Sequence, residues 1–364
     1  MDVFSDQRIV MTLDAGGTNF VFSALQRGKE IVEPVTLPSN GKDLDRCLKN
    51  IIRGFEEVEF KVDGSADAIS FAFPGPADYP AGVIGDLENL PCFKNGVALG
   101  PMLEDKFGLP VFINNDGNLF TYGEAMGGLL KEVNEKLKMN AIPKQYENLF
   151  GVTVGTGFGG GMVMNNNLCL GDNSAASEIW ITRNYTNQET TAEEGVSVRA
   201  IQKAYREYAP ESEEKMTPRE IYQIARGEKA GNREAARKAY EDMGVALGEA
   251  IANAISLVDG LVVIGGGICG AYDLFLPKVV NHLNGTISMQ DGRKTSRLVS
   301  TIYNMEEEDS TKNFYQYASK EVTVPYSDRK VQYVPEKRLA IGITRLGTSK
   351  ATALGAYAYA LSQL

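Results

Sequence analysis

The sequence predicts an α/β protein built from two domains of similar topology. The chain has 364 residues, and at about 150 residues per domain two domains are favoured. Segments typical of buried strands alternate with segments whose apolar residues have helical spacing. Twice, at residues 8–25 and 149–164, a strand runs into a glycine-rich turn and a second strand follows at once. Each of the two turns is therefore expected to open its own domain.

The first half predicts a hairpin followed by alternating helices and strands. The hairpin pairs a strand at 8–13 with one at 20–25 around the turn Asp14-Ala15-Gly16-Gly17-Thr18-Asn19. The expected elements after it are a helix at 43–58, a strand at 66–73 ending in Pro74-Gly75-Pro76, a helix at 99–107, a strand at 110–114 and a helix at 117–129.

The second half repeats the opening pattern and adds irregular segments. Residues 131–147 are polar and rich in Lys, Glu and Asn, so a loop or insertion is expected there. Residues 286–335 are polar and mixed, which predicts an elaborated or partly mobile segment. The other expected elements are strands at 149–154, 162–164 and 261–264, a mostly helical stretch at 197–257 and a helix at 350–361.

Composition excludes several functions. The net charge is −10 and the pI is near 4.9, so nucleic acid is not expected as a main partner. The single histidine, His282, excludes His-rich metal sites and is expected at the surface or at a helix end. The most apolar long window, 250–271, is interrupted by polar residues and glycines, so no membrane span is predicted.

Cysteine usage and the N-terminal sequence favour a cytoplasmic protein. No CxxC pair occurs, which predicts free thiols in a reducing compartment. The first ten residues lack the pattern of a signal peptide. The four scattered cysteines are Cys47, Cys92, Cys169 and Cys269.

Three glycine clusters follow predicted strands, at 16–17, 155–161 and 265–267. Glycine allows backbone N–H groups to approach an anion closely, and ligands of α/β proteins gather at strand ends. The string 155–160 satisfies GxGxxG, but a strand is predicted after it where a dinucleotide site needs a helix. A Rossmann site is therefore not predicted, and no P-loop motif occurs.

Two carboxylates at strand ends are candidates for chemistry. Asp14 could hold Mg²⁺ through water while its turn faces phosphate, or it could simply form the turn. Asp116 could serve as the general base of phosphoryl transfer to an alcohol, or as a helix N-cap. Asn115, beside it, could donate a hydrogen bond to a hydroxyl group.

Seven motifs resemble, in order, those of the ROK family (repressor, open reading frame, kinase). They are LDAGGTN (13–19), FPGPAD (73–78), ENLP (88–91), INNDGNLFTYGE (113–124), VGTGFGGG (154–161), SEIW (177–180) and VIGGGI (263–268). The family consists of sugar kinases and sugar-sensing repressors. The resemblance implies the actin-like ATPase (ribonuclease H-like) fold, in which two α/β domains flank a cleft.

The resemblance also implies binding residues for ATP, Mg²⁺ and a sugar. The implied phosphate and nucleotide residues are Asp14, Gly16, Gly17, Thr18, Gly155, Thr156, Gly157, Gly265, Gly266 and Gly267, with Mg²⁺ near Asp14. The implied sugar residues are Gly75, Asn89, Asn115, Asp116, Glu178 and Glu193, with Asp116 as the catalytic base. The alignment leaves Glu193 ambiguous with Glu194.

The chain departs from the family pattern at its zinc site. Trp180 stands where the family has a zinc-binding histidine, and it could stack on a sugar or fill the core. The family's cysteine positions fall on Asn184, Thr186 and Thr191, so structural zinc is expected to be absent.

The resemblance favours the catalytic branch of the family. The first phosphate motif begins by residue 13, so a winged-helix module is expected to be absent. We expect a small domain of residues 1–115 plus 350–364 and a large domain of residues 116–349. The expected activity is phosphorylation of glucose at its 6-hydroxyl. The alternatives are a kinase for N-acetylglucosamine, N-acetylmannosamine, mannose or fructose, and a non-catalytic regulator. The family alone suggests a homodimer.

Overall fold

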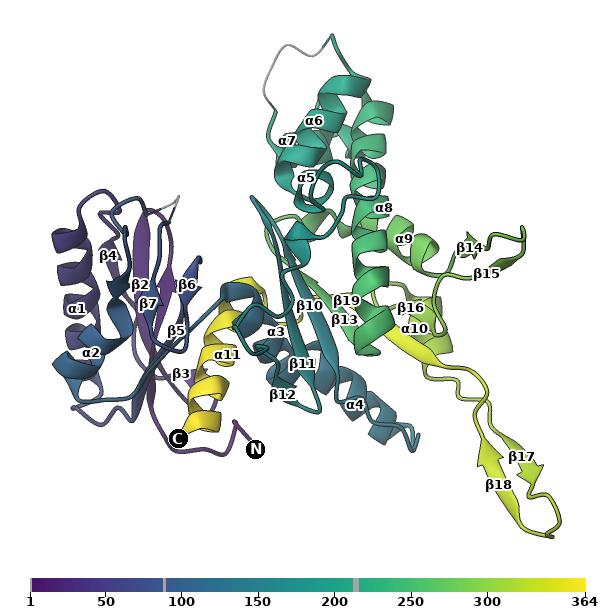
Figure 1. Cartoon of the computed structure of the whole chain (residues 1–364), viewed down its shortest axis with the longest axis horizontal. Helices are drawn as coiled ribbons and strands as arrows, with labels where there is room; N and C mark the ends of the chain where they lie inside the picture. The colour runs from purple at the N-terminus through teal and green to yellow at the C-terminus, as the bar shows by residue number, and fades with distance from the viewer. Residues whose placement is uncertain (1, 88–89, 212–215) are drawn as a thin grey trace. The chain divides into compact units, whose positions relative to one another are not determined.

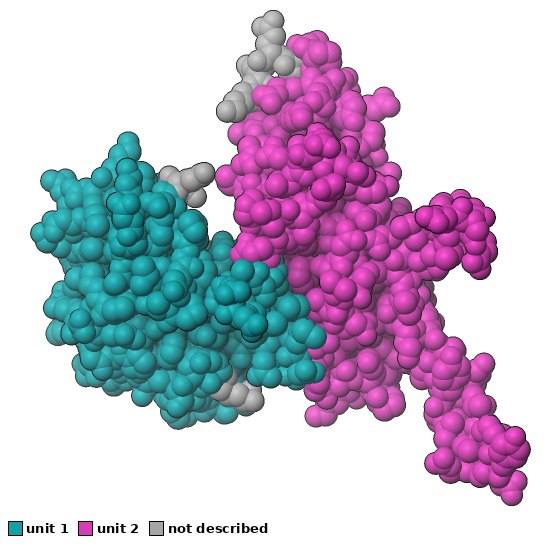
Figure 2. All heavy atoms as spheres, in the orientation of Figure 1, with its two compact units in different colours: residues 1–131, 161–177, 345–364 teal, residues 132–160, 178–344 magenta. Residues whose placement is uncertain are grey.

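The computed structural model describes residues 2–87, 90–211 and 216–364, which form two compact units (Figure 1). The first comprises residues 1–131, 161–177 and 345–364, and the second comprises residues 132–160 and 178–344 (Figure 2). The domain boundaries expected at 115 and 349 remain a prediction. In the structure, residues 116–131 belong to the first unit, where α3 packs along α11.

The first unit contains a sheet with the order β3-β2-β1-β5-β9, and β4 pairs with β2. Strands β1 (Val10–Ala15) and β2 (Asn19–Gln26) form the expected antiparallel hairpin. Strands β5 (Ala68–Ala72) and β9 (Val111–Asn114) continue the sheet in parallel with β1. The short strands of this unit are β3 (Lys29–Glu30), β4 (Val35–Pro38), β6 (Ala77–Asp78), β7 (Val83–Ile84) and β8 (Val97–Ala98).

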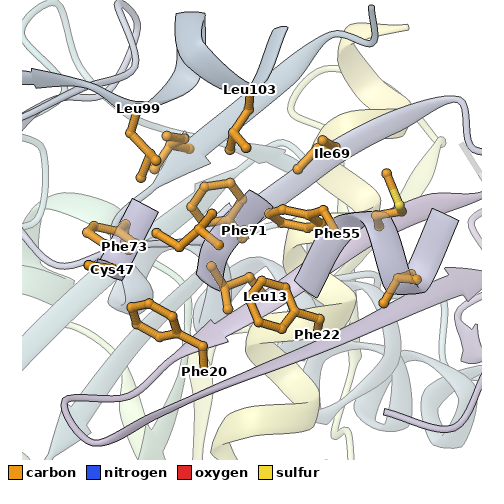
Figure 3. Close-up of a cluster of buried hydrophobic side chains, with 14 of the residues drawn as sticks. Leu13, Phe20, Phe22, Cys47, Phe55, Ile69, Phe71, Phe73, Leu99 and Leu103 are labelled. Atoms are coloured by element: carbon orange, nitrogen blue, oxygen red, sulfur yellow. The ribbon is translucent and has the colours of Figure 1, made fainter. Parts of the chain in front are cut away.

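An aromatic core lies between this sheet and helices α1 (Leu44–Lys61) and α2 (Leu99–Phe107). Phe22 and Phe55 pack edge to face with ring centroids 5.1 Å apart. Figure 3 shows these rings with Phe71, Phe73 and Cys47. Alternate side chains of a strand point to opposite faces, so one face of β1 and β2 supplies this core.

Helices α3 (Asp116–Gly127) and α11 (Thr348–Gln363) pack tightly together in the same unit. Ala72 of β5 joins Leu119 of α3 and Ala356 of α11 in a buried cluster. A Cβ placed on Gly355 would collide with the backbone of Leu119, and one on Gly123 with the backbone of α11. Glycine therefore lets the two helix backbones approach more closely than any side chain would permit.

The second sheet repeats the pattern of the first, as the two glycine turns predict. Its order is β12-β11-β10-β13-β19-β16. A hairpin of β10 (Leu149–Val154) and β11 (Phe158–Met164) is followed by β13 (Leu261–Gly265) and β19 (Arg338–Ile343), which run parallel to β10. The short strand β12 (Asn167–Leu168) pairs with β11. Strand β11 directly follows the glycine turn, so the prediction of a strand rather than a helix at this position is confirmed.

Helices occupy much of the second unit, as expected from the mostly helical pattern of residues 197–257. They are α5 (Glu193–Val196), α6 (Val198–Tyr208), α7 (Pro218–Arg226), α8 (Arg233–Val258) and α9 (Tyr272–Leu283). Among the residues described, no helix has both the length and the apolar character needed to cross a bilayer.

The prediction of a loop or insertion at 131–147 is wrong for residues 131–139, because helix α4 spans Leu129–Met139. Charged residues dominate the composition of α4, but its apolar residues have helical spacing. Leu129, Val133 and Leu137 are four residues apart and are fully buried. The polar count alone therefore gives a misleading prediction.

The segment 286–335 is more ordered than its composition predicts. Strand β16 (Thr301–Asn304) pairs in parallel with β19, and helix α10 spans Glu308–Phe314. Two exposed hairpins, formed by β14 (Thr286–Ser288) with β15 (Lys294–Ser296) and by β17 (Lys320–Thr323) with β18 (Lys330–Tyr333), account for much of the remainder. Figure 1 shows β17 and β18 extending from the rest of the second unit.

His282 lies in the last turn of α9 and forms part of an ionic cluster with α8. Its Nε2 lies 2.8 Å from Glu249 Oε2, and Arg297 Nη2 donates to Glu249 Oε1 at 2.9 Å. Burial by itself would raise the pKa of Glu249, but the hydrogen bonds from Arg297 and His282 outweigh it and hold the pKa below 4.5. The helix-end position expected for His282 is confirmed.

Candidate active site

Two carboxylates share a pocket at one edge of the first sheet. Strands β1, β5 and β9 are parallel, so their carboxyl ends meet at this edge. Asp14 lies near the end of β1, and Asp116 follows β9 as the first residue of α3. Both line a pocket of about 490 Å³. The strand end Ala72–Pro74, the turn residue Gly17 and the first turns of α11 complete much of its wall.

Asn115, rather than Asp116, caps helix α3. Asn115 Oδ1 accepts a hydrogen bond from the Gly117 N–H at 2.8 Å, and Asp116 Oδ1 accepts from the same N–H at 2.8 Å. The alternative that Asp116 is the N-cap is therefore wrong, since it is already the first helical residue. The cap occupies Asn115 Oδ1, so its amide nitrogen is the group suited to donate to a ligand hydroxyl.

The protein around Asp116 makes its carboxylate a stronger base. Burial raises the pKa of Asp116, the Gly117 N–H opposes that rise, and the Asp14 carboxylate adds to it. The net direction is upward. The side chain nevertheless keeps an exposed surface. Asp116 can therefore meet a substrate hydroxyl in the pocket and accept its proton.

The turn after Asp14 is held by backbone and side-chain hydrogen bonds. Ser39 Oγ donates to Gly17 O at 2.6 Å, and the Ser39 N–H donates to Thr18 O at 2.9 Å. A Cβ on Gly16 would lie 2.8 Å from Asn19 O, so this tight turn requires glycine. The bonds fix the turn while Gly17 and Thr18 remain exposed.

In the second unit, the two other glycine turns lie side by side. The turn 155–157 ends β10, and the turn 265–267 ends the neighbouring parallel strand β13. Gly266 has a φ of +96°, and any Cβ there would collide with the Val154 backbone. The Val198 N–H donates to Gly155 O at 2.9 Å, which brings the start of α6 to the same edge. Glycine turns beside a helix N-terminus suit phosphate binding.

Glu193 contacts the turn at 155–157 directly. Its Oε2 accepts from the Phe158 N–H at 3.0 Å, and its Oε1 accepts from Arg199 Nη2 at 2.8 Å. Arg199 also donates to Thr156 O at 3.4 Å and pairs with Glu194 at 3.1 Å. These contacts identify Glu193, rather than Glu194, as the carboxylate that contacts this turn. Its role toward a sugar remains a prediction.

Glu178 and Trp180 form an exposed pair. Trp180 belongs to the short helix η1 (Ile179–Ile181), and its indole N–H donates to Glu178 Oε2. The Trp180 side chain is 39% exposed, so the alternative that it fills the core is wrong. An exposed indole next to a carboxylate can contact a sugar by stacking.

A hydrogen-bonded loop occupies the positions where the family has zinc-binding cysteines. Asn184 is buried, and its Oδ1 accepts from Thr186 N at 3.0 Å and Thr186 Oγ1 at 2.9 Å. The Asn184 amide donates to Thr190 Oγ1 at 3.2 Å, and the backbones of Arg183 and Thr191 pair in an isolated antiparallel β-bridge. Within the described part of the chain, no three His, Cys, Asp or Glu side chains are grouped so as to hold a metal.

The remaining expected residues have different outcomes. Gly75 is exposed and follows Pro74, which lines the pocket. Asn89 lies outside the described residues. Three hydroxyl residues of α11 that were not predicted for the site line the same pocket: Thr348, Ser349 and Thr352. The signal for them was the run of hydroxyl residues at the start of a predicted helix.

The ROK family model matches residues 10–302, and the chain belongs to the ROK family. A solved structure from Parabacteroides distasonis, described as a glucokinase, is 49% identical, has a TM-score of 0.90 and aligns over 100% of both chains. A glucokinase of Thermotoga maritima is 28% identical over 46% of this chain and 48% of its own. An N-acetyl-D-glucosamine kinase of Vibrio cholerae is 31% identical over 46% of this chain and 50% of its own. The chain thus spans about half the length of these two curated relatives.

Proposed function

We propose that this protein is an ATP-dependent sugar kinase that phosphorylates a hexose, with glucose and its 6-hydroxyl as the favoured acceptor. The observation that carries the proposal is the pocket in which Asp14 and Asp116 lie together at the ends of parallel strands. Phosphoryl transfer to an alcohol needs a carboxylate to accept the hydroxyl proton and donors that neutralise phosphate charge. The first unit offers that base, and both units offer glycine turns suited to phosphate.

Asp116 acts as the general base in this proposal. Its raised pKa improves proton acceptance as the sugar hydroxyl attacks the terminal phosphoryl group of ATP. The proton moves from that hydroxyl to the Asp116 carboxylate, the new O–P bond forms and the bond to ADP breaks. Asn115, whose oxygen already caps α3, donates its amide hydrogens to orient the sugar.

Asp14 fits a role in holding Mg²⁺. Proteins commonly bind Mg²⁺ through one or two carboxylates, with water and substrate phosphates as the other ligands. Asp14 supplies an exposed carboxylate in the pocket, beside a glycine turn that suits phosphate. When bound, Mg²⁺ neutralises charge on the transferring phosphate. The turns at 155–157 and 265–267 of the second unit are themselves suited to bind phosphate.

Glucose is favoured by the relative that covers the whole chain, which is described as a glucokinase. N-acetylglucosamine is the main alternative, because partial relatives are described as kinases of that sugar. Glu178 is proposed to bind sugar hydroxyls, and Trp180 to stack on the ring. N-acetylmannosamine, mannose and fructose are further alternatives. A non-catalytic regulator is disfavoured because it would not require a base such as Asp116.

The test is ADP release with ATP and Mg²⁺ across these hexoses and N-acetylhexosamines. One sugar should stimulate turnover by about 10³-fold or more over ATP alone, in keeping with enzymatic rate enhancements. The Asp116→Asn variant should lose activity by about 10²–10⁴-fold, the usual contribution of a general base. It should still bind the sugar in calorimetry. Full activity of Asp116→Asn would overturn the mechanism. Sugar-dependent stabilisation of the parent without turnover would favour the regulator.

A further inference from the structure

Two of the four cysteines, distant in the sequence, lie near each other in the first unit. Cys47 lies in the first turn of α1 and is fully buried (Figure 3). Cys92 is half-buried and packs against the apolar cluster that contains Cys47. The Cys92 N–H donates to Gly41 O at 3.0 Å, which fixes its backbone near the start of α1. The Cys92 thiol lies close enough to Cys47 to act on its pKa.

The two sulfur atoms have unequal access to solvent. Burial, together with the neighbouring Cys92 thiol, raises the pKa of Cys47 to about 12, so Cys47 stays protonated at neutral pH. Cys92, with part of its surface exposed, is the thiol that a small oxidant reaches first. Cys269 has a different environment, since its thiol donates to Ile264 O at 3.3 Å within the second unit.

We infer that Cys47 and Cys92 are a modification site that hydrogen peroxide converts to a disulfide. The Cys92 sulfur attacks one peroxide oxygen, the S–O bond forms and the O–O bond breaks; the proton that the Cys92 thiol gives up joins the departing hydroxide, so that Cys92 sulfenic acid and water form. The Cys47 sulfur then attacks the Cys92 sulfur, the S–S bond forms, and the S–O bond breaks. The Cys47 proton leaves with the released hydroxide as a second water. In total, two thiols and one peroxide yield one disulfide and two waters.

The disulfide would tie a wall of the candidate pocket to α1. Leu90, two residues before Cys92, lines the pocket with Asp14 and Asp116. The Phe93 N–H donates to Leu90 O at 3.0 Å, so Leu90–Phe93 forms a turn that includes Cys92. The disulfide itself needs only that the two cysteines lie near each other, as their shared cluster and the Cys92–Gly41 bond indicate. Its effect on turnover rests on the proposed kinase function, where restraining this turn should lower kcat/KM for the sugar.

The first experiment uses the full-length parent protein and does not depend on activity. The reduced protein is treated with hydrogen peroxide, remaining thiols are alkylated, and peptides are mapped without reductant. We expect a peptide that joins Cys47 to Cys92, lighter by two hydrogens than the two reduced peptides and separated again by dithiothreitol. Alkylation of both residues after oxidation, or a linkage through Cys169 or Cys269, would overturn the inference.

Matched variants assign any change in activity. Peroxide should lower the sugar-dependent turnover of the parent, and dithiothreitol should restore it. Cys92→Ser should lose this reversible inhibition, whereas Cys269→Ser should keep it. Inhibition that persists in Cys92→Ser would contradict the link between the disulfide and the pocket. If the parent shows no kinase activity, the proposed function fails, while peptide mapping still decides the modification site.

Discussion

Glu124 offers a sharp test of how the first unit is held together. Its side chain is fully buried in the last turn of α3. Oε1 accepts from the N–H groups of Arg345 at 3.0 Å and Leu346 at 3.1 Å. Oε2 accepts from Leu129 N at 3.0 Å and Arg345 N at 3.3 Å. One carboxylate thus fixes the end of α3 and the segment that leads into α11.

Glu124→Gln preserves the shape but replaces one acceptor oxygen with an amide group that faces backbone donors. Either Leu129 or Leu346 then loses its carboxylate acceptor, and the remaining bonds lose their charge. A hydrogen bond to a charged group contributes about 1.5–3 kcal/mol, and an unsatisfied buried donor costs about 1–3 kcal/mol. We therefore expect the free energy of unfolding to fall by about 3–5 kcal/mol, a large part of a typical stability of about 5–15 kcal/mol.

The assay is urea unfolding at neutral pH, followed by far-ultraviolet circular dichroism. The midpoint should fall while the slope of the unfolding free energy with urea stays the same. Glu104→Gln, an exposed change on α2, is the matched control and should alter stability by less than about 0.5 kcal/mol. A Glu124→Gln protein within about 1 kcal/mol of the parent would refute the reasoning, because breaking a buried polar network is among the large effects.

Three further predictions concern other contacts. Gly355→Ala should destabilise the protein by about 1–3 kcal/mol in urea unfolding, although alanine favours helix, because its Cβ would overpack against Leu119; a more stable variant would contradict this. The stabilisation from the lowered pKa of Glu249 is complete above about pH 4.5 and is lost as the pH falls through the folded-state value. The free energy of unfolding of Glu249→Gln should therefore fall less steeply than that of the parent as the pH is lowered below about 4.5. An unchanged dependence on acid pH would contradict this prediction. Glu193→Gln should raise the KM for ATP severalfold by weakening the bond to Phe158 N, and an unchanged KM would argue against support of the turn.

Local sequence patterns were sufficient for most of the fold. The hairpins at β1–β2 and β10–β11 carry buried runs on both sides of a glycine turn, which determines their form. Helix α4 was not predicted, because charged residues outnumber the buried leucines in its sequence. Strand β16 is only four residues long, and its place beside β19 depends on partners remote in the sequence.

The candidate site could be predicted only in part, for a similar reason. The nearness of Asp14 and Asp116 could be predicted because each lies at the carboxyl end of a strand, and strand order brings such ends together. The hydroxyl residues of α11 were missed, since their nearness to Asp116 depends on the helix packing on α3. The nearness of Cys47 and Cys92 could not be predicted, because sequence spacing does not report which distant segments pack together.

The segmented make-up of the first unit has a consequence for the order of synthesis. Residues 345–364 complete this unit, although its sheet is made from residues before 131. On the ribosome, the second unit can begin to fold while α11 has yet to emerge. Until then, the buried cluster of Ala72 and Leu119 lacks its partner Ala356. The nascent chain therefore passes through a stage with an exposed apolar surface, and chaperones that recognise such surfaces would act at this stage.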